Sequence, residues 1–356
     1  MARWFYGLLL ILSVAVLLSV YISPLHVPLA GLLSLGIPLL LLGHGVLFVF
    51  MLLSRSRWFW VPLLVLVLSF PYLKATFRWP SADRFQEART EETLEVLSYN
   101  VHLFRYNREK RNPAEFRESI ARWLSEHPAD IKCIQEFYQD ETTASTHMIR
   151  RLAQDQGMHI SYQPVQRRRQ RQSIGMAIIS RYPIVNEGRV FDNSRNNGVI
   201  FADIRWNSDT IRVYNAHLES MSIQAEALKD VEGFKENYYD VARKIRNGQV
   251  TRARQLAQLQ QHIADSPYPV LLMGDFNDTP YSYLYFNLRQ NLSNAFERAG
   301  SGFGFTYNRV LFFLRIDHLF YQEDFFDVTD FKTYSAVDYS DHYPIGALLR
   351  KRSGTP

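Results

Sequence analysis

The chain begins with a long apolar stretch and continues with a longer part in which short apolar runs alternate with polar ones. Trp4 to Ser54 contains no Asp, Glu, Lys or Arg, and prolines divide it into Phe5–Tyr21 and Leu29–Leu53. A third apolar run covers Trp58–Leu73. Because a membrane span needs about 20 apolar residues, this pattern predicts an anchor of transmembrane helices, three in all, within residues 1–78.

The basic residues around these runs predict an orientation. Positively charged loops stay in the cytoplasm, which places Arg3 there together with Arg55 and Arg57. A third span then carries everything after Lys74 out of the cytoplasm. The prediction is a multi-pass protein of the cell membrane whose main domain is extracytoplasmic, and periplasmic in a Gram-negative cell. If the third run only lies along the membrane surface, that domain stays cytoplasmic.

The remainder of the chain predicts one large folded domain. Residues 79–92 are polar and aperiodic, as in a linker, residues 93–350 form the domain, and 351–356 are a tail. Strands separated by helices are typical of an α+β sandwich. The strands expected are Leu94–Tyr99, Ile131–Ile134, Gly175–Ser180, Gly198–Arg205, Thr210–Ala216, Pro269–Met273, Ile316–Tyr321 and Ile345–Arg350. The helices expected are Pro113–Glu126, Thr143–Gln156 and most of Ser222–Ile263.

Charge and cysteine content exclude some classes of protein. All 35 acidic residues lie at or after Asp83, and five of the 40 basic residues precede it, so the remainder carries 35 of each sign. This part of the chain therefore has no net positive charge, whereas a protein that binds duplex nucleic acid typically has a strongly basic surface. Cys133 is the only cysteine, which excludes an intrachain disulfide framework and a cysteine-rich zinc site.

Six predicted strands share a feature that bears on function: each is followed or bordered by polar side chains able to bind metal or phosphate. These segments are Leu97–Asn100, Asp130–Glu136, Tyr214–Leu218, Met273–Asp278, Arg315–His318 and Ser340–Ile345.

Together the six segments supply a mixed set of oxygen and nitrogen donors. The carboxylates of Glu136, Asp275 and Asp341 and the amides of Asn100 and Asn277 are hard oxygen ligands, which suit Mg²⁺ or Mn²⁺. The set also includes two imidazoles, and a further carboxylate that could orient one of them: His217, His342 and Asp317.

The order of these motifs is similar to that of the endonuclease/exonuclease/phosphatase family. The motifs are Asn, Gln-Glu, Asn-x-His-Leu, Gly-Asp-Phe-Asn-Asp, Arg-Ile-Asp-His and Ser-Asp-His, and Gly175–Ile184 resembles the family's central strand and turn. The resemblance covers roughly Leu94–Leu349. It implies a four-layer sandwich of two mixed β-sheets flanked by helices, and divalent-metal-dependent hydrolysis of a phosphoester, most readily a phosphodiester.

The resemblance also implies a role for each residue. Glu136 is the main metal ligand, with Asn100 and Asp341 beside it. Asp275 orients or deprotonates the attacking water, and Asn277 helps to hold the water and the phosphate. His342 contacts the phosphate and is oriented by Asp317, and His217 is a candidate acid or transition-state stabiliser. Asp278, Asn215 and Asp130 are expected to support the site, whereas His318 should point to the opposite strand face and His102 should be a surface or packing residue.

The substrate stays open between a lipid head group and nucleic acid. The basic run Arg167–Arg171 is expected on a loop, either near the cleft or facing solvent or membrane, and the insert Met221–Arg254 could form a cleft wall. Phe137-Tyr138 departs from the Thr-Lys pair of abasic-site nucleases. An anchored enzyme acting on lipid-borne or extracytoplasmic phosphoesters is favoured, with the bilayer as a partner and no protein partner inferable. A membrane-tethered nuclease acting on DNA or RNA and a non-catalytic binding module are the alternatives.

Overall fold

The computed structural model describes residues 2–79, 90, 92–104, 113–144, 146–169, 171–192, 197–221, 231–309 and 311–352. The chain divides into two compact units. Unit 1 comprises Met1–Phe77, Met221–Arg254 and Thr279–Leu288, and unit 2 comprises Arg78–Ser220, Gln255–Asp278 and Arg289–Pro356. The linear boundaries expected from the sequence remain a prediction, and most of the expected linker lies outside the described residues.

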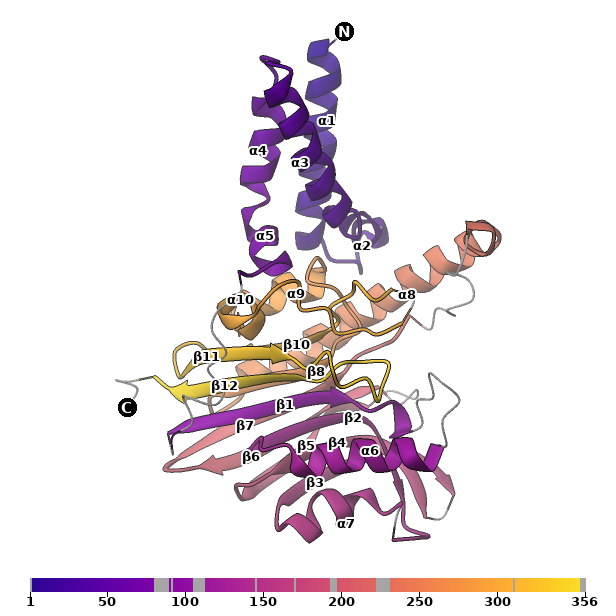
Figure 1. Ribbon diagram of the computed structural model, residues 1–356, viewed down its shortest axis with the longest axis vertical. Coiled ribbons are helices and arrows are strands. Elements are labelled where there is room, and N and C mark those ends of the chain that lie inside the picture. The colour runs from indigo at the N-terminus through magenta and orange to yellow at the C-terminus, as the bar shows by residue number, and fades with distance from the viewer. Residues whose placement is uncertain are drawn as a thin grey trace. The chain divides into compact units, whose positions relative to one another are not determined.

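Unit 2 is built on two mixed six-stranded sheets, as the sequence resemblance implies (Figure 1). The strand order is β11-β12-β1-β2-β4-β3 in the first sheet and β5-β6-β7-β8-β10-β9 in the second. β1 runs parallel to β2, β7 runs parallel to β8, and all other neighbours are antiparallel. The strands are β1 Thr93–Asn100, β2 Ile131–Asp140, β3 His159–Arg169, β4 Gln172–Ser180, β5 Ile184–Asp192, β6 Gly198–Trp206, β7 Asp209–His217, β8 Val270–Asp275, β9 Ser293–Asn294, β10 Asp317–Tyr321, β11 Phe326–Thr333 and β12 Ile345–Lys351.

Alternation along the strands builds the layers of unit 2, because successive side chains point to opposite faces of a sheet. Val96 belongs to a buried cluster that joins the two sheets, with Val213 among its members from the second sheet. Leu97 belongs to a cluster on the outer face of the first sheet, with Ile120 of α6 (Pro113–Glu126) and Leu152 of α7 (Met148–Leu152).

A helix also covers the outer face of the second sheet. Near the end of α8 (Val231–Ala264), the Nδ1 atom of His262 lies 2.8 Å from the Tyr214 hydroxyl, and its ring packs on Phe201 at 4.8 Å between centroids. The order helix, sheet, sheet, helix therefore confirms the expected four-layer sandwich. The remaining short elements of unit 2 are η2 (His102–Phe104), η3 (Gln154–Gln156) and α10 (Ala295–Ala299).

The strands predicted from sequence are the interior strands of the two sheets, and the four edge strands β3, β5, β9 and β11 were missed. One consequence concerns Arg167, which was expected on a loop but pairs with Ser173 within the β3–β4 ladder. The side chains of Arg168 and Arg169 lie outside the described residues. In the described part of the expected helix Thr143–Gln156, the helical elements are α7 and η3, so helix covers less of this segment than predicted.

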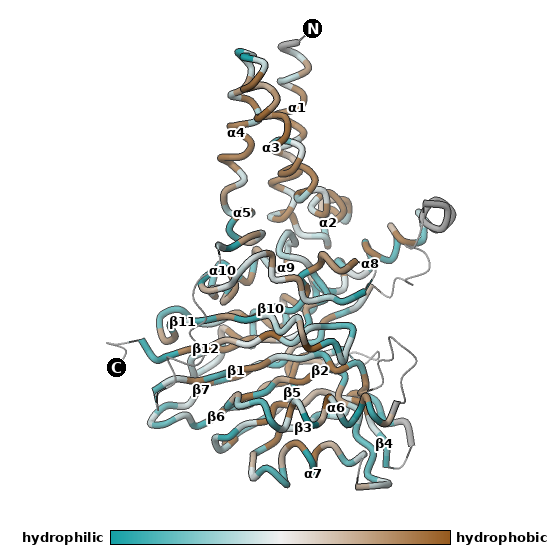
Figure 2. Tube along the Cα trace, in the orientation of Figure 1, coloured by the Kyte–Doolittle hydropathy of each residue, from teal (hydrophilic) through white to brown (hydrophobic). Residues whose placement is uncertain are grey.

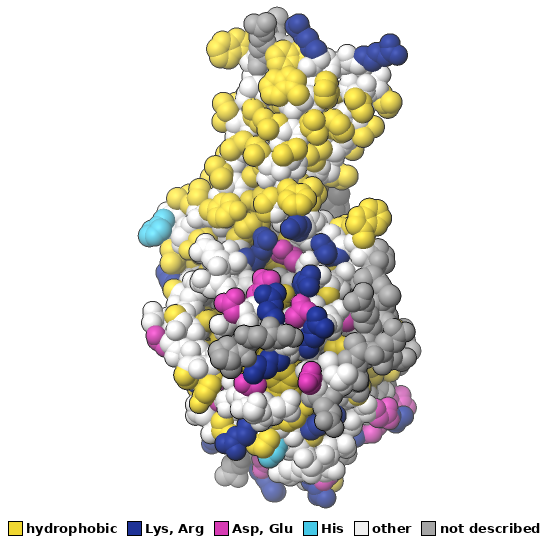
Figure 3. Space-filling view, turned by 90° about the vertical axis from the view of Figure 1, so that its left-hand side faces the viewer, with side chains coloured by type: hydrophobic (Ala, Val, Ile, Leu, Met, Phe, Trp, Pro, Cys, Tyr) yellow, Lys and Arg dark blue, Asp and Glu magenta, His cyan; other side chains and the backbone are white. Residues whose placement is uncertain are grey.

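Unit 1 contains helices whose surfaces are largely apolar (Figures 2 and 3). Trp4–Tyr21 is the one helix among the described residues that is long and apolar enough to cross a membrane. Pro28–Ser34 and Ile37–Leu53 pass the same criterion together, although they are bent by 45°. The third apolar run does not pass, because it forms two short helices that meet at Ser69. The N-terminal helices are α1 Ala2–Leu18, η1 Ser19–Tyr21, α2 Pro28–Ser34, α3 Ile37–Leu53, α4 Trp60–Leu68 and α5 Phe70–Thr76.

Unit 1 also includes segments from later in the chain. Phe286 of α9 (Tyr283–Leu288) packs against Tyr21 and Tyr72, with ring centroids 5.6 and 4.8 Å away. The side-chain amide of Gln249 in α8 donates a hydrogen bond to the Gly31 carbonyl at 2.8 Å, and this side chain is buried. These contacts hold the N-terminal helices and the later segments in one compact body.

Candidate functional site

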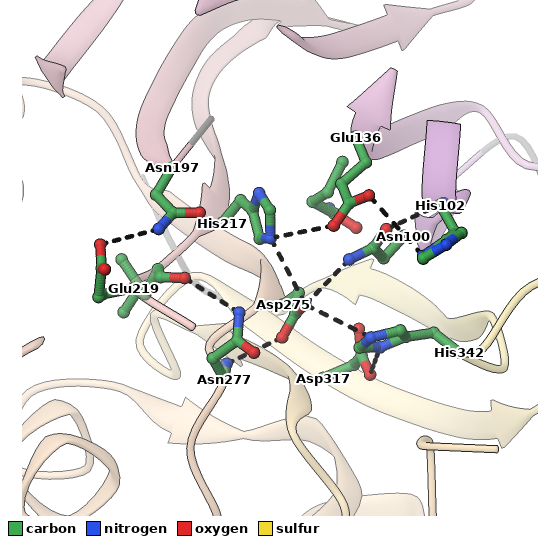
Figure 4. Close-up of polar contacts among 12 residues, drawn as sticks. Asn100, His102, Glu136, Asn197, His217, Glu219, Asp275, Asn277, Asp317 and His342 are labelled. Atoms are coloured by element: carbon green, nitrogen blue, oxygen red, sulfur yellow. Dashed lines mark hydrogen bonds and ion pairs between the residues drawn. The ribbon is translucent and has the colours of Figure 1, made fainter. Parts of the chain in front are cut away.

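Strand pairing places three polar residues in one row across the second sheet. In β7 and β8, His217 is the register partner of Asp275, and Asp275 is in turn the partner of Asp317 in β10. Residues directly opposite one another on adjacent strands project from the same face. The row therefore presents an imidazole and two carboxylates together (Figure 4).

Asp275 is the centre of this arrangement. Its Oδ2 atom accepts a hydrogen bond from the Asn100 side chain at 3.0 Å, and its Oδ1 atom accepts one from the Asn277 backbone at 2.8 Å. The Nε2 atoms of His217 and His342 lie 3.7 and 3.6 Å from Oδ2. Asp275 is 1% exposed, so these neighbours determine its electrostatic environment more than solvent does.

Gly274 allows β8 to approach β7 closely beside Asp275. Its φ of +149° lies in a region that side-chain-bearing residues rarely adopt, and a Cβ there would lie 2.0 Å from the Ala216 carbonyl oxygen. The glycine in the Gly-Asp motif is therefore required for the strand spacing that brings His217 and Asp275 together.

A β-bulge directs Glu136 into the site. The β2–β4 register shifts between Ile134 and Phe137, and Glu136 has a φ of 51°. The amide of the preceding residue, Gln135, turns into the core and donates to Asn215 Oδ1 at 2.6 Å. Glu136 keeps 24% of its side chain exposed and lies 3.8 Å from His217. Bulges commonly re-aim a side chain next to a functional site, and this one does so here.

His342 and Asp317 form a buried pair. The His342 Nδ1 atom lies 2.8 Å from Asp317 Oδ2, and both side chains are buried. Burial by itself lowers the pKa of His342, but the charges of Asp317 and Asp275 outweigh it and raise that pKa well above the ordinary value. The ring of Tyr307 packs edge-on against His342 at 5.3 Å.

Asp341 is surrounded by cationic partners. Its Oδ1 atom lies 3.2 Å from His102 Nδ1, and its Oδ2 atom lies 3.2 Å from Arg309 Nε. Burial raises the pKa of this carboxyl group, but His102, His342 and Arg309 lower it far more, so the net pKa lies well below the usual range. Asp341 is held as a carboxylate.

The structure thus brings all eight residues expected at the site into one connected network. Asn215 supports it from the core, where its amide donates to the Ile134 and Ala177 carbonyl groups. His318 points away and contacts the Asp278 carbonyl at 2.9 Å, as expected. Asp130 does not belong to the site, because it precedes β2 and binds the Glu95 backbone and Arg181 there.

Sequence reasoning missed His102 and Arg309. His102 was expected at the surface or in packing, but its ring lies between Asp341 and Glu136, 3.2 and 3.9 Å away. Its position two residues after Asn100, at the end of β1, was a signal that could have identified it. Arg309 lies in a segment without regular structure, and nothing in its sequence context pointed to the site.

Two groups of side chains have the chemistry of a metal site. Asp275, Asp317 and His342 each place one ligand atom within 4.8 Å of the others. The Asp317–His342 hydrogen bond already uses one of those imidazole nitrogens, however, which favours proton handling over metal binding at this group. Across the site, Glu136, Asn100 and Asp341 supply the hard oxygen donors that divalent cations prefer. This second set offers oxygen donors of the kind that bind divalent metal ions.

Models of two known protein families together match most of the chain. A model of the "Endonuclease/Exonuclease/phosphatase family" matches residues 97–342. A second model, described as "Domain of unknown function (DUF8431)", matches residues 1–76. No curated protein matches the sequence.

Several solved structures share the fold. An endonuclease/exonuclease/phosphatase from Beutenbergia cavernae DSM 12333 has a TM-score of 0.53 and 18% identity over 73% of this chain and 72% of that chain. The human Nocturnin catalytic domain with a bound sulfate anion has a TM-score of 0.52 and 17% identity over 73% and 95% of the two chains. A humanized D. rerio TDP2 has a TM-score of 0.52 and 14% identity over 73% and 99%. At these identities the likeness concerns the fold alone.

Proposed function

The chain belongs to the endonuclease/exonuclease/phosphatase family, and from that membership we propose that it hydrolyses a phosphoester, most readily a phosphodiester, in a divalent-metal-dependent reaction. The observation that carries the proposal is the arrangement around Asp275. One buried carboxylate lies between two imidazoles, within 3.7 Å of each, and accepts hydrogen bonds from Asn100 and Asn277. A general base, two groups able to stabilise phosphoryl charge and a metal-binding face therefore converge on one point.

In this proposal Asp275 takes or directs the proton of the attacking water. A carboxylate within hydrogen-bond reach of a water can act as its general base. The Asn277 side chain donates to the Leu218 carbonyl at 3.0 Å while its backbone holds Asp275, so it fixes the loop on which water and phosphate are held.

The two histidines are proposed to act on the phosphoryl group. Asp317 keeps His342 protonated and oriented, so the imidazolium can neutralise charge that grows on the phosphoryl oxygens. His217 lies between Glu136 and Asp275 and is placed to stabilise the transition state or to donate a proton.

We propose Mg²⁺ or Mn²⁺ as the cation, held mainly by Glu136 with Asn100 and Asp341 beside it. When bound, the ion would polarise the phosphoryl group and neutralise its charge. The Asn100 side chain connects the two halves of the site, since its amide nitrogen donates to Asp275 while its oxygen accepts the His102 backbone N–H at 3.1 Å.

For the substrate we propose a lipid-borne phosphodiester rather than a nucleic acid. Among its described residues the chain has one helix long and apolar enough to cross a membrane, Trp4–Tyr21, and we propose that this helix keeps the enzyme at a bilayer. In addition, Phe312 and Phe313 are 64% and 51% exposed and follow closely after Tyr307 and Arg309, which contact His342 and Asp341. Exposed aromatic side chains suit an apolar interface next to the reacting phosphate.

The first test is hydrolysis of bis-p-nitrophenyl phosphate by the full chain in lipid nanodiscs, with Mg²⁺, with Mn²⁺ and with EDTA. We expect metal-dependent turnover that Glu136→Gln and His342→Gln abolish. The exposed residues Glu187 and His159 provide matched controls, and Glu187→Gln and His159→Gln should retain turnover. Metal-independent turnover, or full activity in both site variants, would contradict the proposal.

A second test separates the two substrate classes. Phospholipid vesicles and single-stranded oligonucleotides are compared as substrates for the same nanodisc preparation. Preferential cleavage of the lipid supports the proposed substrate, and preferential cleavage of the oligonucleotide would favour a membrane-tethered nuclease.

A further inference from the structure

The segment 306–314, which we call the rim loop, borders the site, and its residue 310 lies outside the described residues. The Tyr307 backbone N–H donates to the Leu314 carbonyl oxygen at 3.1 Å, so the two ends of the loop lie together. Tyr307 also forms an antiparallel bridge with His342, and its ring packs against that imidazole at 5.3 Å. The base of the rim loop is therefore fixed to the residue that is proposed to act on the phosphoryl group.

The next residues of the rim loop reach a second site residue. The Asn308 backbone N–H donates to the Asp341 carbonyl oxygen at 2.7 Å, and the Nε atom of Arg309 lies 3.2 Å from Asp341 Oδ2. Asn308 is buried, whereas Arg309 keeps 33% of its side chain exposed. Arg309 is thus held next to the reacting groups at a position that solvent, and hence a substrate, can reach.

Neutralisation of Asp341 does not by itself account for Arg309. The His102 Nδ1 atom lies 3.2 Å from the other oxygen of this carboxylate, Oδ1, and the Ser340 hydroxyl donates to the same oxygen at 3.3 Å. A guanidinium has five N–H donors in a planar fork that matches the oxygens of a carboxylate or a phosphate. One arginine can therefore contact Asp341 and a phosphoryl oxygen at the same time.

The far part of the rim loop carries the exposed aromatic pair, Phe312 and Phe313. Arg309 and Phe312 are three residues apart, so their Cα atoms are separated by at most about 10 Å. An apolar face at a membrane surface is buried about 5–10 Å into the boundary between head groups and acyl chains. The aromatic pair can therefore contact the apolar part of a lipid layer while Arg309 stays at the depth of the phosphates.

We propose that Arg309 is a substrate-binding residue whose guanidinium donates to an oxygen of the phosphoryl group while its Nε atom stays beside Asp341. The inference rests on the proposed function, and it specifies a residue that binds the substrate of that function. A phosphoryl oxygen is negatively charged in the substrate and in the product, so Arg309 binds both as well as the transition state. Its loss therefore weakens substrate binding more than it slows the chemical step.

The test separates binding from turnover. Full-length protein in nanodiscs, with Mg²⁺ or Mn²⁺, is assayed on bis-p-nitrophenyl phosphate and on mixed phosphatidylcholine and phosphatidylglycerol vesicles. Binding of inorganic phosphate to the same preparation is measured by isothermal titration calorimetry. In Arg309→Gln we expect KM for both substrates and the dissociation constant of phosphate to rise by about tenfold or more, while kcat changes by less than about threefold.

Two further variants make the result specific to the guanidinium. Arg309→Lys keeps the positive charge but loses the planar fork, so its KM and its phosphate affinity should lie between those of the wild type and Arg309→Gln. Arg205→Gln, at an exposed arginine on β6, should leave all of these quantities unchanged. Thermal unfolding of each variant identifies any loss of fold.

The outcomes distinguish this inference from the proposed function. Unchanged KM and unchanged phosphate affinity in folded Arg309→Gln would overturn the role of Arg309, and continued hydrolysis would leave the proposed function standing. A fall in kcat at unchanged KM would also overturn it, because Arg309 would then act only by positioning Asp341. If the wild type hydrolysed neither substrate, the proposed function would be wrong, whereas weaker phosphate binding in Arg309→Gln would still support the role of Arg309.

Discussion

The Nδ1 atom of His342 lies 2.8 Å from the Oδ2 atom of Asp317, in a place where both side chains are buried. A carboxylate only accepts hydrogen bonds, so Nδ1 must carry the proton. The Nε2 atom of the same ring then faces Asp275, 3.6 Å away. Asp317 thus determines both the orientation of His342 and which of its nitrogens faces the reacting groups.

Asp317→Asn should preserve the fold and impair the reaction. The amide would remove the negative charge that keeps His342 protonated, so the ring would become neutral and would stabilise charge on the phosphoryl group less. We expect kcat to fall by about 10²–10⁴ with little change in KM. Steady-state kinetics on bis-p-nitrophenyl phosphate measure this, with Asp209→Asn, which breaks an ion pair with Lys351, as the control. A change confined to KM would argue against an orienting role.

Gly274→Ala should lower the stability of the protein as well as its rate of hydrolysis. The added Cβ would lie 2.0 Å from the Ala216 carbonyl oxygen, at a φ of +149°, so β7 and β8 would have to separate between His217 and Asp275. We expect a loss of about 2–3 kcal/mol in the free energy of unfolding. Chemical unfolding of the full chain in detergent micelles measures this loss.

Gly157→Ala is a matched control for that variant. Gly157 also has a positive φ, of +65°, but nothing lies within 4 Å of the added atom. It should cost only about 1 kcal/mol, which isolates the backbone preference from the steric clash. Equal losses in the two variants would show that the close approach of the strands is not what requires Gly274.

His318 should contribute to acid sensitivity. Burial, with a smaller effect from Arg315, lowers the pKa of His318 from 6.5 to about 3. Between those values the unfolded chain binds a proton that the folded chain does not, so the free energy of unfolding falls as pH falls, by up to about 1.4 kcal/mol per pH unit. His318→Gln lacks this titration. Its stability should therefore depend less steeply on pH between about 6.5 and 3, as measured by urea unfolding at several pH values, and parallel pH curves would exclude this contribution.

The exposed aromatic pair provides a test of the lipid substrate. Phe312→Ser combined with Phe313→Ser should slow hydrolysis of vesicle-borne substrate by about tenfold or more, which corresponds to roughly 1.4 kcal/mol of lost apolar contact. Hydrolysis of bis-p-nitrophenyl phosphate should be unchanged, because the two rings lie outside the reacting groups. Val185→Ser, at another exposed apolar position, is the control. An equal loss on both substrates would indicate damage to the site instead.

The sequence predicted the interior of unit 2 well because interior strands are apolar on both faces. In β8, all six residues from Val270 to Asp275 are buried. Edge strands lack such a run: β3 includes the polar stretch up to Arg169, and β5 exposes Val185 and Glu187. Half-exposed strands leave little contrast with a loop, and their assignment depends on the partner strand with which they pair.

Most of the site residues could be predicted for a related reason, and the features that could not be predicted also have a physical explanation. Asn100, His217 and Asp275 end strands whose register the core determines, so short motifs were enough to place them together. The inward direction of Glu136 depends on a bulge, which exists only relative to β4. His102 depends on a left-handed turn imposed by tertiary contacts. Neither feature leaves a periodic signal in a single chain.

The three chain segments that make up unit 1 have a consequence for proteolysis of the protein. Its later segments begin at Met221, four residues after His217, and at Thr279, two residues after Asn277. They are held to the N-terminal helices by the rings of Tyr21, Tyr72 and Phe286 and by the Gln249 amide. A protease that cleaved the chain once between Trp79 and Glu92 would therefore not release unit 2 from the N-terminal helices, because the severed helices would stay bound to the later segments of unit 1 as a non-covalent subunit.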